Sequence, residues 1–135
     1  MDDESRRLAG ILLVVFPTVV FGGVSLLRML TSRVHGYADN PLRQDLWRAG
    51  HAHAGVLLIL SLVALLYVDD AALSEGWKTF VRNGIPATAI LLPVAYLLSV
   101  LSPDAKKPNG LIYLAYAGAV VLTVALAALG VGLLR

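Results

Sequence analysis

Two histidines separated by a single residue are the side chains in this sequence best suited to chemistry. His51 and His53 stand in the run 47–55, WRAGHAHAG, at the start of a long apolar segment. Residues two apart on a helix point in directions about 200° apart. One regular helix therefore cannot present both rings to a single ion. It can present one ring to each of two sites, or one to the interior of a helix bundle and the other to a neighbouring subunit.

Imidazoles in a membrane segment have two interpretations, and the sequence leaves both open. In the first, His51 and His53 bind a transition metal or serve as axial ligands of b-type haem, because ionisable side chains within membranes are usually functional. Arg48 would then meet a haem propionate, and His35 would be a further metal ligand. In the second, no cofactor is bound and the histidine pair is merely interfacial. His35 is then a solvated loop side chain, and Arg48 extends its charge to the membrane surface.

The expected topology gathers other polar and soft side chains at the same end of the helices. The first helix ends there and the second begins there, so all three histidines lie on one side of the membrane. A carboxylate at this end could orient an imidazole by accepting a hydrogen bond from its second nitrogen. The further side chains expected at this end are Met29, Asp39, Asp45, Tyr113 and Tyr116. Of these, Met29 is expected to pack rather than to bind.

The run His51-Ala52-His53-Ala54-Gly55, followed by a long apolar helix, resembles the histidine-pair helix of the heme-copper oxidase catalytic subunit family. The resemblance covers about one helix and rests on a short motif. It implies that the two histidines ligate two haems on opposite flanks of that helix. It also implies that four helices form one arc of a ring of three, so that a homotrimer of this chain would match the whole ring.

The sequence departs from that family in two respects. No other histidine lies in a membrane segment, so one chain cannot build a copper centre that needs three more of them. The family's tyrosine that is crosslinked to a copper-ligating histidine also has no counterpart here. The resemblance therefore implies haem binding and does not imply oxygen reduction.

The composition indicates that the helices carrying these residues lie in lipid. Of the 135 residues, 58% are hydrophobic and 15% are charged, which leaves more apolar surface than a soluble domain of this size could bury. A helix needs about 20 apolar residues to cross a bilayer. The sequence predicts an all-α, integral membrane four-helix fold in one domain, 1–135, with spans at 8–30, 49–68, 84–102 and 111–134.

Four crossings place both termini on one face of the membrane. Lys and Arg are divided almost evenly between the two faces, so their distribution does not give the orientation. On a single arc, His53 would face lipid on the outer flank without a partner, which is costly for a polar group. We therefore expect a homo-oligomer, with a trimer preferred, in a prokaryotic cytoplasmic membrane.

Composition also disfavours several classes of function. The chain has no cysteine, which excludes c-type haem attachment, iron–sulfur clusters and cysteine nucleophiles. Its formal net charge of +2, without a basic run, gives no basis for nucleic-acid binding. No nucleophile–base pair can be assembled from Ser25, Ser61 or Ser99 with a histidine, which disfavours a hydrolytic enzyme. The sequence leaves open whether the chain is an enzyme and favours that it is not. We expect a haem-binding or metal-binding protein with an electron-transfer or haem-handling role. The alternative is a structural or assembly protein without a cofactor.

Overall fold

The computed structural model describes all residues, 1–135, and is entirely helical. Its elements are α1 (Asp3–Thr31), α2 (Pro41–Tyr67), α3 (Glu75–Ser99), the short 3-10 helix η1 (Gly110–Ile112) and α4 (Tyr113–Leu133). Four helices are long and apolar enough to cross a membrane. This confirms the prediction of an all-α chain with four helices of membrane-spanning length and hydropathy.

Two helices begin well ahead of their predicted spans. α2 begins at Pro41, because the side chain of Asn40 accepts a hydrogen bond from the backbone N–H of Arg43 at 3.2 Å and proline suits the first helical turn. α3 begins at Glu75, directly after the second loop. As a consequence Arg43 and Arg82, which the predicted spans leave in loops, stand on helices.

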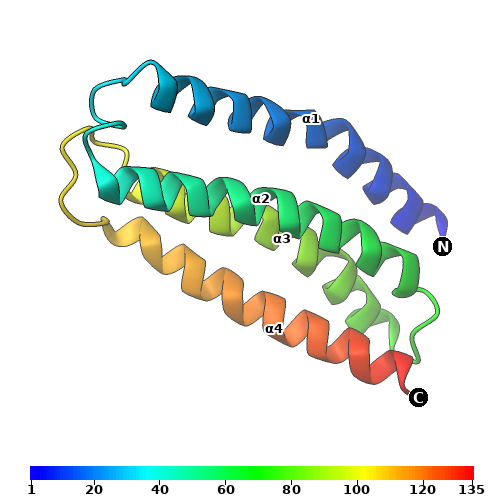
Figure 1. The fold of residues 1–135 in the computed structure, drawn as a ribbon. Helices are drawn as coiled ribbons and strands as arrows, with labels where there is room; N and C mark the ends of the chain where they lie inside the picture. The colour runs from blue at the N-terminus through cyan, green and yellow to red at the C-terminus, as the bar shows by residue number, and fades with distance from the viewer.

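The helices run in alternating directions, so the N and C termini lie at the same end of the molecule (Figure 1). We call this the terminal end, and the opposite end, which holds the α1–α2 and α3–α4 loops, the histidine end. α2 and α3 pack closely together, α1 packs on α2, and α4 packs on α3. Figure 1 shows α1 and α4 on opposite sides of this central pair.

Burial is unequal between the two outer sides of the central pair. Only 6% of the most apolar window of α1 is buried, against 44% of that of α3. Leu12 is the one buried apolar side chain of α1. By contrast, Val81, Ile85 and Ala125 belong to a buried cluster formed by α2, α3 and α4. α1 is therefore a peripheral helix, and contacts near its ends must contribute much of what holds it in place.

Arg82 ties α1 to the rest of the chain at the terminal end. Its side chain is only 3% exposed, and it pairs with carboxylates of Asp2, Glu4 and Asp69 at 2.7, 2.7 and 2.8 Å. It also donates to the hydroxyl of Ser5 at 3.0 Å. Burial would by itself raise the pKa of Asp69, but hydrogen bonds donated by Arg82, by the backbone N–H of Asp2 and by the hydroxyl of Ser5 lower it to about 2. The start of α1 is thus ion-paired to α3 and hydrogen-bonded to the α2–α3 loop.

Arg43 closes the histidine end without a carboxylate. Its guanidinium donates to the backbone carbonyls of Val100 at 2.8 Å and Leu101 at 2.9 Å, and to that of Gly36. It also lies over the ring of Trp47, 4.2 Å from the centroid. Arg43 therefore joins the α1–α2 loop to the end of α3 by donating to neutral backbone carbonyls of both.

Candidate functional site

His53 lies on α2 and turns toward α3. Its Nδ1 is 2.7 Å from the backbone carbonyl oxygen of Ala49, and its ring centroid is 5.1 Å from that of Tyr96. A carbonyl oxygen only accepts hydrogen bonds, so Nδ1 must carry the hydrogen. In the neutral ring, Nε2 then has a free lone pair. Contacts with α2 and α3 therefore fix both the tautomer and the orientation of this ring.

The free nitrogen of His53 reaches the molecular surface. Nε2 makes no hydrogen bond within the chain, whereas every fully buried polar side-chain atom has a partner. Nε2 is therefore accessible from outside the protein, at a depth that falls within the predicted span 49–68. Hydrocarbon cannot form a hydrogen bond with it, so a ligand or a neighbouring protein would stabilise it there.

His51 turns the other way, toward α1. A Cβ atom at Gly23 would lie 3.0 Å from Nε2 of His51, and one at Gly22 would lie 3.5 Å from Nδ1. At Gly23 a side chain would collide with the edge of the ring, so the missing Cβ lets the α1 backbone come close. The two rings of the pair therefore contact different helices, as their spacing on α2 requires.

Two hollows border this side of α2. The first, of about 360 Å³, lies at the histidine end and is lined by His51 together with Met29 and Trp47. The second, of about 640 Å³, is a mostly apolar groove between α1 and α3 that has α2 as its floor. The residues that line both are Thr18, Val19, Ala54, Pro93 and Leu97. The two hollows therefore adjoin, with these residues in the walls of both.

Arg48 lies on the His51 side of α2. It shares a hollow of about 310 Å³ with His51 and Tyr37. Burial raises the pKa of Tyr37, and the positive charge of Arg48 opposes that shift. Of the two histidines in the pair, Arg48 is thus grouped with His51 and not with His53.

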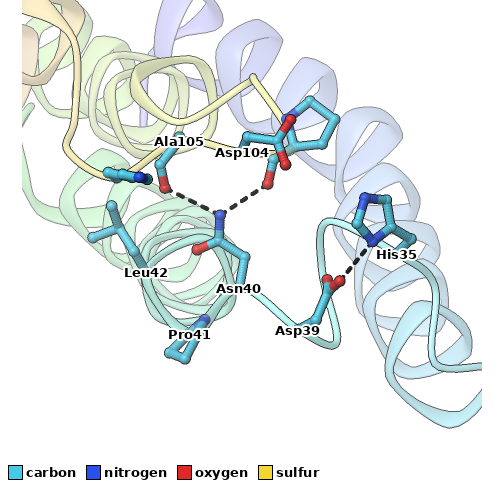
Figure 2. A pocket seen from close by; sticks show the side chains of 9 residues that line it. His35, Asp39, Asn40, Pro41, Leu42, Asp104 and Ala105 are labelled. Atoms are coloured by element: carbon cyan, nitrogen blue, oxygen red, sulfur yellow. Dashed lines mark hydrogen bonds and ion pairs between the residues drawn. The ribbon is translucent and has the colours of Figure 1, made fainter.

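His35 is remote from the pair, in the α1–α2 loop. Its Nδ1 is 2.6 Å from a carboxylate oxygen of Asp39, and 80% of its side chain is exposed. Figure 2 shows this pair beside Asn40, whose side-chain amide donates to the carbonyls of Pro103 and Ala105 at 2.9 and 3.1 Å. Asp39 therefore orients an imidazole as expected, but it is the imidazole of the loop, and Asn40 fastens that loop to the α3–α4 loop.

The other side chains expected at the histidine end are only partly brought together. Met29 borders the same hollow as His51. Asp45 is exposed and contributes no hydrogen bond to a histidine. Tyr113 and Tyr116 lie beside each other, with 6.1 Å between ring centroids, and both are largely exposed. Met29 is therefore the one member of this set that joins the surroundings of the histidine pair.

The three histidines have three different surroundings. His35 pairs with a carboxylate in its own loop, His51 packs on α1, and His53 packs on α3. No group of three or more His, Cys, Asp or Glu side chains is arranged to hold a metal ion. The set of metal ligands offered by the sequence, His51, His53 and His35, is therefore not assembled within one chain.

Sequence reasoning did not connect the histidines with the groups that position them. The adjacent glycines 22 and 23 were a readable signal, because small residues in a membrane helix indicate a close approach by another helix. Tyr96 and the carbonyl of Ala49 gave no such signal, since no motif links either to His53. Both depend on the rotamer of His53 and on the packing of α2 against α3.

The arrangement around α2 supports two kinds of chemistry. The surface nitrogen of His53 can ligate a metal centre that approaches from outside, and the groove beside His51 can receive an apolar molecule. These two possibilities lie on different sides of the same helix. No protein-family model, curated protein or solved structure matches the chain.

Proposed function

We propose that this chain is an integral membrane protein that binds b-type haem, with Nε2 of His53 as an axial ligand of the iron. The state of that nitrogen is the observation that carries the proposal. A histidine that binds a metal almost always donates its other ring N–H to a carboxylate, a backbone carbonyl or water. The hydrogen bond from Nδ1 of His53 to the carbonyl of Ala49, at 2.7 Å, is of this kind.

Haem is favoured over a bare metal ion by the number of protein ligands that each requires. The porphyrin supplies most of the iron's ligands, so one or two axial side chains suffice. A zinc ion, by comparison, needs three or four protein ligands. The surface around His53 offers one imidazole, because His51 turns toward α1 and His35 lies in a loop.

Bound haem would supply a centre that gains and loses one electron. The protein's own contribution is to hold the imidazole. The Ala49 carbonyl keeps the hydrogen on Nδ1 and so leaves the lone pair on Nε2, while Tyr96 supports the ring from α3. The role that follows is electron transfer or the handling of haem within the membrane.

A second copy of the chain would complete such a site. His53 provides one axial ligand, and α2 exposes large apolar side chains, among them Val56, Ile59 and Val63. A neighbouring copy packed against this surface would cover the porphyrin and could supply the other axial ligand. We therefore propose a homo-oligomer, and prefer a trimer in which each copy forms one four-helix arc of a ring.

His51 and Arg48 are not assigned to this haem. His51 turns toward α1 at Gly22 and Gly23, and Arg48 shares a hollow with His51 on that side of α2. A haem on His53 would approach from the other side. The proposal therefore keeps one of the two histidines that the sequence offers as axial ligands.

Absorbance tests the proposal directly. Purified protein supplied with haem should show a saturable Soret band, and His53→Leu should abolish it. His35→Leu is the matched control, because it removes an imidazole from an exposed loop at the same end of the molecule. A wild-type protein that binds no haem would favour the alternative, a structural or assembly protein without a cofactor.

The tautomer of His53 can be measured without haem. In ¹⁵N-labelled protein, Nδ1 of His53 should be protonated and Nε2 should not, because only Nδ1 has an acceptor. The opposite tautomer, with the hydrogen on Nε2, would remove the observation on which the proposal rests.

A further inference from the structure

His51 lies on the α1 side of α2, at the border of two hollows. Neither of its ring nitrogens makes a hydrogen bond within the chain, and every fully buried polar side-chain atom does have a partner. The nitrogens of His51 must therefore reach the surface of a hollow. A neutral imidazole offers one N–H donor and one acceptor. Nδ1 lies nearest Gly22, which lines the hollow at the histidine end, so Nδ1 is the nitrogen available to a molecule there.

The other polar groups around the hollow at the histidine end already donate within the protein. The indole N–H of Trp47 donates to the carbonyl of Leu97 at 3.1 Å. The hydroxyls of Thr18 and Ser25 each donate to a carbonyl of α1 at 2.8 Å. His51 is thus the free hydrogen-bond donor of this compartment.

No charged side chain lines this compartment. Arg48 borders a different hollow, and the walls here are aromatic, thioether and aliphatic, with Phe21, Met29 and Trp47 among them. A phosphate or carboxylate head group would find no cation to pair with. The compartment therefore suits a neutral, flat head group that accepts one hydrogen bond.

The groove that continues from this compartment suits a long hydrocarbon chain. It has a volume of about 640 Å³ and runs between α1 and α3 as far as Leu8 and Asn83, toward the terminal end. Its floor includes Ala54 and Leu58 of α2. Since α1 is the least buried helix, it can shift to admit a chain of variable thickness.

We propose that the two adjoining hollows open into one groove that binds an isoprenoid quinone. One quinone carbonyl accepts a hydrogen bond from the ring N–H of His51, the quinone ring lies among Phe21, Met29 and Trp47, and the isoprenoid tail follows the groove between α1 and α3. The site lies on the opposite side of α2 from His53, so quinone binding does not depend on the haem proposal.

Quenching of tryptophan fluorescence tests this site in the full chain. The sequence has two tryptophans, so Trp77→Phe leaves Trp47 as the single reporter, in the wall of the proposed head-group compartment. Haem-free protein in nanodiscs of uncharged phospholipid is titrated with decyl-benzoquinone. We expect saturable quenching, and about a tenfold weaker affinity in His51→Leu, since one hydrogen bond to the head group is lost. His51→Gln, which keeps an N–H donor, should recover part of the affinity.

The matched control makes the same type of substitution, alanine to leucine, at two positions on different sides of α2. Ala54→Leu narrows the junction of the two hollows and should weaken binding about tenfold or more, whereas Ala52→Leu places the same side chain on the exposed side and should leave affinity unchanged. The thermal stability of both variants is measured, and affinities are compared only between proteins of equal thermal stability. Quenching that rises linearly with quinone and is equal in all variants would mean that lipid chains fill the groove, which would overturn the proposal.

Discussion

α2 meets its two neighbours in different ways, and the two histidines divide along that difference. Toward α3 the helices touch closely: a Cβ at Gly50 would lie 3.1 Å from the Cβ of Tyr96 and 3.4 Å from the carbonyl oxygen of Pro93. Toward α1 the contact is close at Gly23, beside His51, but farther along the helix there is room: a Cβ at Gly55 would meet only Val19, at 3.7 Å, and the long groove runs alongside.

Close packing and open packing suit different chemistry. A metal ligand must be held in one orientation, and the tight side of α2 fixes His53 through a hydrogen bond and a ring contact. A lipophilic molecule needs volume and a wall that can move, and the open side provides two adjoining hollows beside a peripheral helix. One helix can therefore serve two ligands because its neighbours pack against it to different degrees.

The largest expected effect comes from releasing α1. Arg82→Met removes the buried cation that three carboxylates share, and leaves Asp69, only 14% exposed, without its partner. We predict a loss of about 3 kcal/mol in the free energy of unfolding, at the low end of the usual cost because the other two carboxylates are partly wet. Denaturant titration in detergent micelles measures it.

The control for the loss of unfolding free energy in Arg82→Met is a second arginine at the terminal end. Arg6 pairs with Asp3 at 3.0 Å, but the side chains are 68% and 96% exposed. Arg6→Met should change the free energy of unfolding by less than about 0.5 kcal/mol. Equal effects of the two substitutions would mean that the Arg82 cluster does not hold α1.

Replacing one glycine on each side of α2 by leucine tests the difference in packing between the two sides. Gly50→Leu forces a side chain against Tyr96 and the backbone of Pro93, and should cost up to about 3 kcal/mol of unfolding free energy, the upper range for overpacking. Gly55→Leu inserts the same side chain toward α1, which can shift, and should cost less than about 1 kcal/mol. A reversed order would refute the difference in packing.

Acid should weaken the attachment of α1 through Asp69. Its pKa in the folded protein is about 2, below its ordinary value of 3.8, so folding favours the charged carboxylate. The stabilisation is therefore fully present above about pH 4 and is lost as the pH falls through about 2, by about 2 kcal/mol in total. Unfolding measured across this range should lose that pH dependence in Asp69→Asn. A wild-type profile that is flat below pH 4 would show that the ion pairs do not stabilise the fold.

Most of the fold was predictable from the sequence because lipid imposes a simple requirement. Apolar runs long enough to cross a bilayer must be helical, so the number and order of the helices followed from hydropathy. The starts of α2 and α3 were not predicted, since hydropathy marks only the apolar run of each helix, and the cap at Asn40 and the start at Glu75 lie outside it. For the same reason Arg43 and Arg82 were assigned to loops, although both are buried on helices.

The directions of the two histidine rings were predictable from the sequence, but the contacts that the rings make were not. The spacing of His51 and His53 requires that their rings diverge, and they contact α1 and α3 respectively. The hydrogen bond that fixes the tautomer of His53 depends on a rotamer and on a carbonyl one turn away, and neither leaves a mark in the sequence. The groove depends on how loosely α1 packs, which follows from the whole arrangement of helices.

The most direct test measures haem binding and quinone binding in the same two variants. Haem absorbance and quenching of Trp47 are measured for His53→Leu and for His51→Leu in nanodiscs. We predict that His53→Leu loses the Soret band and keeps saturable quinone quenching, while His51→Leu keeps the Soret band and binds quinone about tenfold more weakly. If one substitution abolishes both signals, or if the Soret band survives in His53→Leu, the two sides of α2 do not carry separate sites.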